Sequence, residues 1–211
     1  MNDLRPAPSQ ALTTRSERAD AITVLIVGLL ASVVIIGLVS LRALQTFRSD
    51  GIGWILPIDQ QPIEATVGSG VGSLHGYATE ALVIAPNVNV VSIIAIALSH
   101  AVFAAAALTI VGGTLWIAWS FLRGRFFARG TVRALAVISW ALALAPALIF
   151  MLDTFGRNGV LAALSIENDG SVDSDRYWSW LPLFSAGVAL GLVTIAFRRG
   201  ARLQKDTEGL V

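Results

Sequence analysis

Residues 21–41 read AITVLIVGLLASVVIIGLVSL, a run of twenty-one positions without an acidic or basic side chain. An α-helix rises about 1.5 Å per residue, so this run would extend about 32 Å and cross the hydrocarbon core of a bilayer. It is longer than the apolar part of a secretory signal, which spans about 7–15 residues, and no small-residue cleavage site follows it. We therefore expect an uncleaved membrane-spanning helix here.

Three further apolar runs have the length of a membrane span. The second follows Pro86 and the polar residues Asn87 and Asn89, so its helix is expected to begin near Val90. Pro182 lies in the first turn of the fourth run, where a missing N–H group costs little. The predicted spans lie at about 21–44, 90–121, 134–152 and 178–197. The expected fold class is an all-α membrane protein, with four transmembrane helices forming an antiparallel bundle within residues 21–198.

The overall composition excludes several classes of protein. Apolar residues make up 55% of the chain and charged residues 14%, against about 45–50% and about 25% in soluble domains. A net charge of +1 argues against a strongly basic nucleic-acid binder, so no direct nucleic-acid binding is expected. The absence of cysteine excludes a disulfide scaffold, a thiol nucleophile and the common cysteine-containing zinc sites.

Lysine and arginine are distributed unequally between the two sides that four spans create. Eleven of the fifteen lie in residues 1–20, 122–133 and 198–211, and the other four are Arg42, Arg48, Arg157 and Arg176. Cytoplasmic segments of membrane proteins carry the excess of basic residues. We therefore expect cytoplasmic tails at 1–20 and 199–211 and an inner loop at 122–133. Residues 48–89 and 153–177 are expected to be outer loops.

The first outer loop has the composition of strands rather than of a helix. Residues 61–67 and 77–84 are rich in β-formers, and the glycine-rich segment 68–76 lies between them, which favours a small extracytoplasmic β-like insertion between helices 1 and 2. The glycines also invite comparison with a dinucleotide-binding fingerprint. That fingerprint requires glycine where this chain has His75, and it precedes a helix, so a turn is the favoured interpretation.

Neither outer loop has the pattern of a metal site. Oxygen-bearing side chains alternate at 169, 171, 173 and 175, but the glycine and the glutamate that a helix–loop–helix calcium site requires are replaced by Ser174 and Trp180. A solvated acidic loop is the favoured interpretation. In the first loop, one histidine and two carboxylates (His75, Glu64 and Glu80) make a poor zinc set, and their spacing does not require one. No metal or cofactor is expected.

His100 is the titratable residue that lies well inside a predicted span. Ionisable groups at membrane depth are candidate functional sites because burying their charge is costly. A neutral imidazole that is hydrogen-bonded to a neighbouring helix is the favoured alternative, and no intramembrane acid accompanies His100 to form a proton relay. No nucleophile, base and orienting residue converge in the pattern, so an enzyme is not expected.

Small residues in the spans indicate helix packing. Gly187 and Gly191 are four positions apart in the fourth span, and Ala97, Ala101 and Ala105 have the same spacing in the second. Small residues let membrane helices approach closely. Packing within one bundle is favoured over dimerisation, and the oligomeric state stays open.

The predicted cytoplasmic segments combine arginine with aromatic residues. Phe126 and Phe127 lie among Arg123, Arg125 and Arg129, and with Arg199 and Arg202 in the C-terminal tail they are candidates for docking a partner or lipid headgroups. Basic residues near an anionic surface contribute about 1 kcal/mol each. Ordinary positive-inside charge with interfacial aromatic residues is the favoured alternative.

Two cytoplasmic segments resemble a known family. Residues 122–135, LRGRFFARGTVRAL, and residues 197–211, FRRGARLQKDTEGLV, are similar to segments of the four-helix bacterial membrane proteins catalogued as domain of unknown function 2975. The resemblance covers about residues 20–211 and carries no catalytic residues, since that family has no established activity. It implies a location in the bacterial inner membrane and a gene placed beside a helix-turn-helix regulator. We therefore expect a non-catalytic envelope sensor or interaction protein that is coupled to a cytoplasmic regulator. The alternatives are a small transporter or channel that uses His100 and a purely structural membrane protein.

Single cysteines at Ser69, Ser171 and Thr207 test the predicted orientation, since the chain has no cysteine of its own. We expect a membrane-impermeant maleimide to label the first two in intact cells, because both lie in predicted outer segments. The third should react only after the cells are permeabilised. Labelling of Thr207→Cys in intact cells would contradict a cytoplasmic C-terminal tail.

Overall fold

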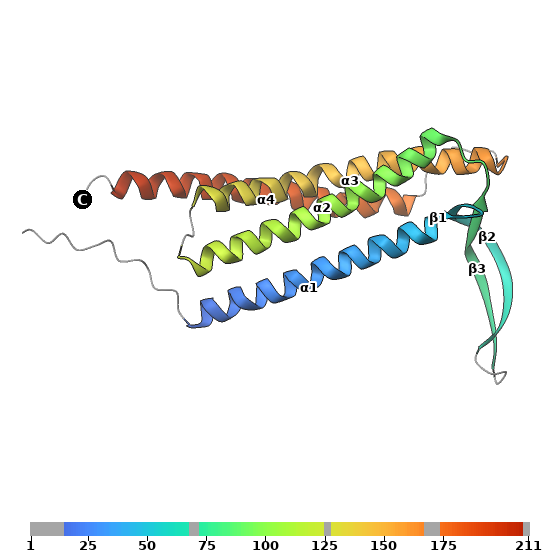
Figure 1. Cartoon of the computed structure of the whole chain (residues 1–211), viewed down its shortest axis with the longest axis horizontal. Coiled ribbons are helices and arrows are strands. Elements are labelled where there is room, and N and C mark those ends of the chain that lie inside the picture. Colours follow the sequence, from blue (N-terminus) through green and yellow to red (C-terminus); the bar gives the residue numbers. More distant parts are fainter. Residues whose placement is uncertain (1–14, 68–71, 125–127, 167–173, 209–211) are drawn as a thin grey trace, which may run out of the picture. The chain divides into compact units, whose positions relative to one another are not determined.

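The computed structural model describes residues 15–67, 72–124, 128–166 and 174–208, and these form four helices and one three-stranded antiparallel sheet (Figure 1). The elements are α1 (Arg15–Thr46), β1 (Phe47–Arg48), β2 (Gly51–Val67), β3 (Gly72–Ala85), α2 (Val90–Leu122), α3 (Arg129–Ala163) and α4 (Ser174–Glu208). All four helices are long and apolar enough to cross a membrane. The predictions of four such helices and of a small sheet between the first two are confirmed.

The helix α2 begins where the sequence pattern placed it. Asn87 has a φ of 61°, which turns the chain after β3. The Asn89 side-chain Oδ1 then accepts a hydrogen bond from the backbone N–H of Ser92 at 2.9 Å. This is the geometry of a helix N-cap, which satisfies one of the backbone donors that the first turn leaves open.

The sheet is larger than the sequence pattern indicated. Its order is β1-β2-β3, and β2 and β3 extend back to Gly51 and forward to Ala85, where they pair in register with Ile52 opposite Ala85. The short strand β1 was not predicted. Gly51 makes its turn into β2 with a φ of 144°, and a Cβ at this position would lie 2.6 Å from the backbone oxygen of Ala85, so only glycine fits.

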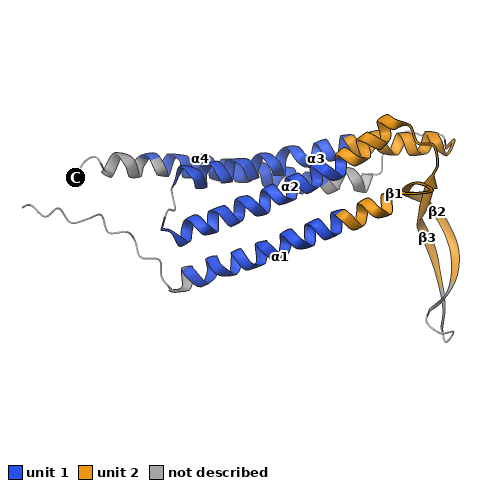
Figure 2. Ribbon diagram, viewed as in Figure 1, with its two compact units in different colours: residues 1–39, 99–151, 172–211 blue, residues 40–98, 152–171 orange. Residues whose placement is uncertain are grey.

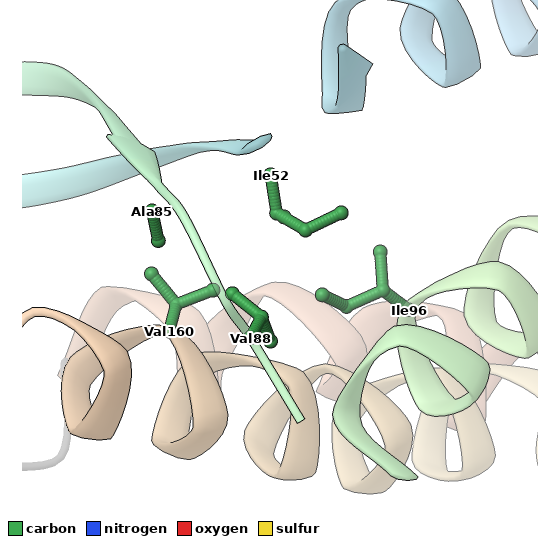
Figure 3. Packing of buried hydrophobic residues seen from close by; sticks show 5 residues of the cluster. All are labelled: Ile52, Ala85, Val88, Ile96 and Val160. Carbon is green, nitrogen blue, oxygen red and sulfur yellow. The ribbon is translucent and has the colours of Figure 1, made fainter. Parts of the chain in front are cut away.

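The chain divides into two compact units (Figure 2). The sheet unit comprises residues 40–98 and 152–171, and the helical unit comprises residues 1–39, 99–151 and 172–211. The buried cluster of the sheet unit joins both strands, the segment after β3 and two helices (Figure 3); its members are Ile52, Ala85, Val88, Ile96 and Val160. The first turns of α2 and the last turns of α3 therefore supply part of the surface on which the sheet packs.

The helix α3 is longer than the predicted span 134–152, and its last turns lie in the segment 153–177 that was predicted as an outer loop. It continues past Asp153 to Ala163, because Val160 and Leu161 are buried among its last turns. The chain then turns away from the helix at Ser165, which has a φ of 55°, and the N–H of Ile166 donates to the oxygen of Leu161 at 3.0 Å. This is the bonding of a Schellman cap, with serine in the position that glycine usually takes.

The large apolar side chains of α1 are mostly exposed within the described chain. Leu29 and Val33, for example, retain 65% and 64% of their accessible surface. The helix approaches α2 closely at Gly28, whose added Cβ would lie 2.5 Å from Leu115 Cδ2. A long helix that is apolar all round and exposed requires an apolar environment to cover it.

Replacing Ile96 by alanine should lower the stability of the sheet unit. Ile96 is fully buried in its cluster, and truncation of a buried isoleucine to alanine costs about 2–5 kcal/mol. Ile94 is 59% exposed on the same helix, so Ile94→Ala is the matched control. Thermal unfolding of the purified protein should show a lower midpoint for Ile96→Ala alone, and equal midpoints for the two variants would contradict the packing.

Candidate functional site

Two glycines of α3 bring this helix against α2 in the sheet unit. A Cβ at Gly156 would lie 2.5 Å from Ile96 Cγ1, and one at Gly159 would collide with the side chain of Ser92. The Ser92 hydroxyl donates a hydrogen bond to the backbone oxygen of Phe155 at 3.1 Å. The contact combines close backbone approach with an interhelical hydrogen bond, the two devices that hold membrane helices together.

Sequence reasoning missed this contact because Gly156 and Gly159 fall in a segment predicted as a loop. The available signal was their spacing of three residues, which places both on one face of a helix once the helix is known to continue. The charged residues Asp153 and Arg157 interrupt the apolar run, so the sequence pattern did not indicate that the helix continues past residue 152.

A second glycine contact joins α3 and α4 in the helical unit. A Cβ at Gly187 would lie 2.7 Å from the backbone nitrogen of Ala143, and one at Gly191 would lie 3.1 Å from Ser139 Oγ. The Ser139 hydroxyl donates to the backbone oxygen of Gly187 at 2.8 Å. The structure thus places both glycines predicted for packing against α3, and the reversed order of their partners shows that the two helices run antiparallel.

The alanine face predicted on α2 has a different environment. Ala97, Ala101 and Ala105 are all exposed within the described chain. Farther along the same helix, a Cβ added at Gly112 would meet nothing within 4 Å. The glycine face of α4 is therefore occupied by a neighbouring helix, whereas the small-residue face of α2 is exposed within the described part of the chain.

His100 lies half-buried on α2, with its Nε2 atom inaccessible to solvent. Its own helix carries no Asp, Glu, Lys or Arg from Val90 to Leu122. The described residues also contain no group of three histidine, aspartate or glutamate side chains with metal-site geometry. His100 is thus a polar group in an apolar helix, without a charged residue on that helix with which to exchange a proton.

The histidine and carboxylates considered for a metal site are only partly brought together. His75 and Glu64 are cross-strand partners, and His75 Nδ1 lies 3.3 Å from Glu64 Oε1, with both side chains mostly exposed. Glu80 is paired with Pro57 instead. Because it lies five residues from His75 on one strand, its side chain projects from the opposite face of the sheet.

The arginines predicted for docking occupy one end of three helices in the helical unit. The guanidinium of Arg123 lies over the ring of Trp119 at 4.6 Å from its centroid, a cation–π arrangement. Arg129, Arg199 and Arg202 are exposed. Arg125, Phe126 and Phe127 fall outside the described residues.

The α3–α4 contact sets the relative level of these arginines along the two helix axes. Arg129 lies ten residues before Ser139, and Arg199 lies ten residues after the midpoint between Gly187 and Gly191. At about 1.5 Å per residue, both are about 15 Å from the contact in the same direction. We call Arg123, Arg129, Arg133, Arg198, Arg199 and Arg202 the arginine end of the helical unit.

Comparison of the chain with the models of known protein families, with curated proteins and with solved structures returned no match.

Gly187 is enclosed by a neighbouring helix, whereas Gly112 is open. Substitution by alanine should therefore change the stability of the protein in opposite directions at the two positions. Gly187→Ala should destabilise the protein by about 1–3 kcal/mol, because the added methyl group meets the backbone of α3, which cannot move aside. Gly112→Ala should be neutral or stabilising by up to about 1 kcal/mol, since alanine is the better helix former and the site is open. Thermal midpoints in mild detergent measure both, and a loss of stability in Gly112→Ala alone would contradict the contact.

Proposed function

We propose that this chain is a multi-pass protein of the bacterial inner membrane that couples an envelope state to a cytoplasmic partner without catalysing a reaction. The four helices form an antiparallel transmembrane bundle, and the sheet unit faces the envelope. Both terminal segments and the arginine end of the helical unit face the cytoplasm. The partner is a regulator of the helix-turn-helix class, consistent with the family that residues 122–135 and 197–211 resemble.

The observation that carries this proposal is the division of α2 and α3 between the two units. Residues 90–98 of α2 and 152–163 of α3 belong to the sheet unit, whereas the remainder of each helix belongs to the helical unit. Arg123 follows the last residue of α2 and Arg129 begins α3. Under this proposal, a ligand that repacks the sheet unit acts on the same two helices that carry these arginines, because coupling requires that both sites bias a shared element.

Exposure and charge support the membrane part of the proposal. Large apolar side chains are exposed on all four helices, and lipid is the environment that covers such surfaces without cost. The helices satisfy their backbone groups internally, as a span must. Arginine is concentrated at the end that this orientation assigns to the cytoplasm, in agreement with the positive-inside distribution.

Removal of the arginine charges tests the coupling. The quadruple variant of Arg125, Arg129, Arg199 and Arg202 to glutamine should lose a cytoplasmic partner that co-purifies with the native protein in mild detergent. The reason is that exposed guanidinium groups are the directional donors which recognise carboxylates and phosphates. The matched control replaces the four arginines outside the cytoplasmic segments, Arg42, Arg48, Arg157 and Arg176, with glutamine, and should keep the partner.

Maleimide labelling at Thr207→Cys in both quadruple variants confirms that each retains its orientation. Recovery of no helix-turn-helix protein with the native chain would contradict the coupling and favour a structural role. Flux across proteoliposomes that disappears in His100→Ala would instead favour a transporter.

A further inference from the structure

The two long strands differ in the protection of their unpaired edges, which for β2 is the part beyond its short pairing with β1. The free edge of β2 contains Pro57 and Pro62, which have no N–H to donate, and the β2–β3 register shifts between Pro57 and Gln61. Prolines and bulges of this kind hinder the pairing of an edge strand with a strand of another chain. The fourteen-residue strand β3 has neither proline nor lysine. Among the residues described, no backbone hydrogen bond joins its outer edge to another element.

The face of the sheet that lies beside this open edge is apolar. Ile55 is paired with Leu82, and Ile84 shares their face two residues farther along β3. Leu82 and Ile55 are each 59% exposed, whereas the opposite face, with Ile52 and Ala85, is buried in the cluster. The solvent face of an antiparallel sheet is normally polar, so this exposed apolar face needs an occupant.

The charge of the two long strands indicates whether lipid, a second copy of this chain or a different protein covers the apolar face. From Ser49 to Leu122 the sequence holds Asp50, Asp59, Glu64 and Glu80 but no lysine or arginine. Asp50 is paired with Arg48, and the acids of the two long strands are Asp59, Glu64 and Glu80, of which Glu64 lies beside His75. An anionic bilayer surface would repel them, and a second copy would place the same acids against themselves.

We propose that the outer edge of β3, between His75 and Ala85, binds an extended cationic segment of another protein by strand addition. Main-chain hydrogen bonds to the open edge supply affinity, and side chains on the shared face supply specificity. On that face the added strand carries apolar residues beside Ile84 and Leu82 and a lysine or arginine beside Glu80. This inference concerns the sheet unit alone and depends neither on the membrane orientation nor on the cytoplasmic partner.

Binding of a synthetic peptide to the full chain in nanodiscs of neutral lipid tests this assignment. The probe is an acetylated and amidated decapeptide, Lys-Val-Lys-Val-Lys-Lys-Lys-Val-Lys-Val, whose even positions share one face of a strand and place valine beside Ile84 and Leu82 and lysine beside Glu80. It should bind and slow hydrogen exchange in residues 75–85, but not in residues 51–64. A Glu-Val decapeptide controls for the sign of the charge. A Lys-Pro decapeptide, Lys-Lys-Pro-Pro-Lys-Lys-Pro-Pro-Lys-Lys, has the probe's charge but carries its prolines in adjacent pairs, so it lacks N–H groups on both sides of a strand and should not bind.

Two variants that add the same charge at different edges locate the site. Leu82→Lys should weaken binding of the Lys-Val peptide at least about fivefold, since it sets a positive charge beside the added strand. Gln61→Lys adds one charge on β2 and should change the affinity by less than about twofold. Because both side chains are exposed, the exchange pattern of each variant without peptide should match that of the native chain.

Three results would overturn the proposal. The first is the absence of binding by the Lys-Val peptide, and the second is equal binding by the Lys-Pro peptide, which would indicate charge attraction without strand addition. The third is a dimer of the native chain that Leu82→Lys dissociates, which would make a second copy the occupant of the edge.

Discussion

The approach of α3 to α2 at Gly159 is the contact on which the sheet unit depends. Because glycine has no side chain, the Ser92 side chain fits against the backbone of α3 and its hydroxyl bonds the oxygen of Phe155. One helical turn away, Gly156 leaves the space that Ile96 and Trp54 fill. Val160 and Ile96 of the helix ends and Val88 of the segment after β3 then form one apolar surface, on which Ile52 and Ala85 of the sheet pack.

The helical unit uses the same device with different residues. Ser139 donates to the backbone oxygen of Gly187, just as Ser92 donates to that of Phe155. In both cases a small residue allows close approach and a hydroxyl supplies a directional hydrogen bond, the two features that also hold membrane helices together. Other hydroxyls, such as those of Ser120 and Thr194, bond the carbonyl four residues earlier in their own helix, so they cost nothing in an apolar environment.

Many features of the helices could be predicted because they depend on local sequence, namely on runs of apolar residues and on capping residues. The start of α2 followed from Asn89, and the contact of Gly187 followed from the spacing of small residues. The extent of α3 could not be predicted, since Asp153 and Arg157 interrupt its apolar run and the burial of Val160 is a tertiary effect. The strand β1 has only two residues and is defined by its pairing with β2, so no local sequence pattern could predict it.

The candidate sites likewise include features that local sequence predicts and features that depend on contacts between distant parts of the chain. The concentration of arginine in these segments could be predicted from the sequence. That the arginines of α3 and α4 lie at the same distance along the two helix axes could be deduced only from the glycine contact between these helices. The environment of Ala97, Ala101 and Ala105 could not be predicted, because the spacing of small residues specifies a face and not whether a neighbour covers it. The open edge of β3 is likewise a property of strand order, and its significance appears only beside the two prolines of β2.

Hydrogen exchange of a Gly159→Leu variant tests most directly whether the α2–α3 contact supports the sheet. The account predicts that amides of β2 and β3 near Ile52 and Ala85 exchange faster than in the native chain. Amides of α3 and α4 around Ser139 and Gly187 should keep their native protection, because they belong to the helical unit. Native protection of the sheet in the variant would contradict the account.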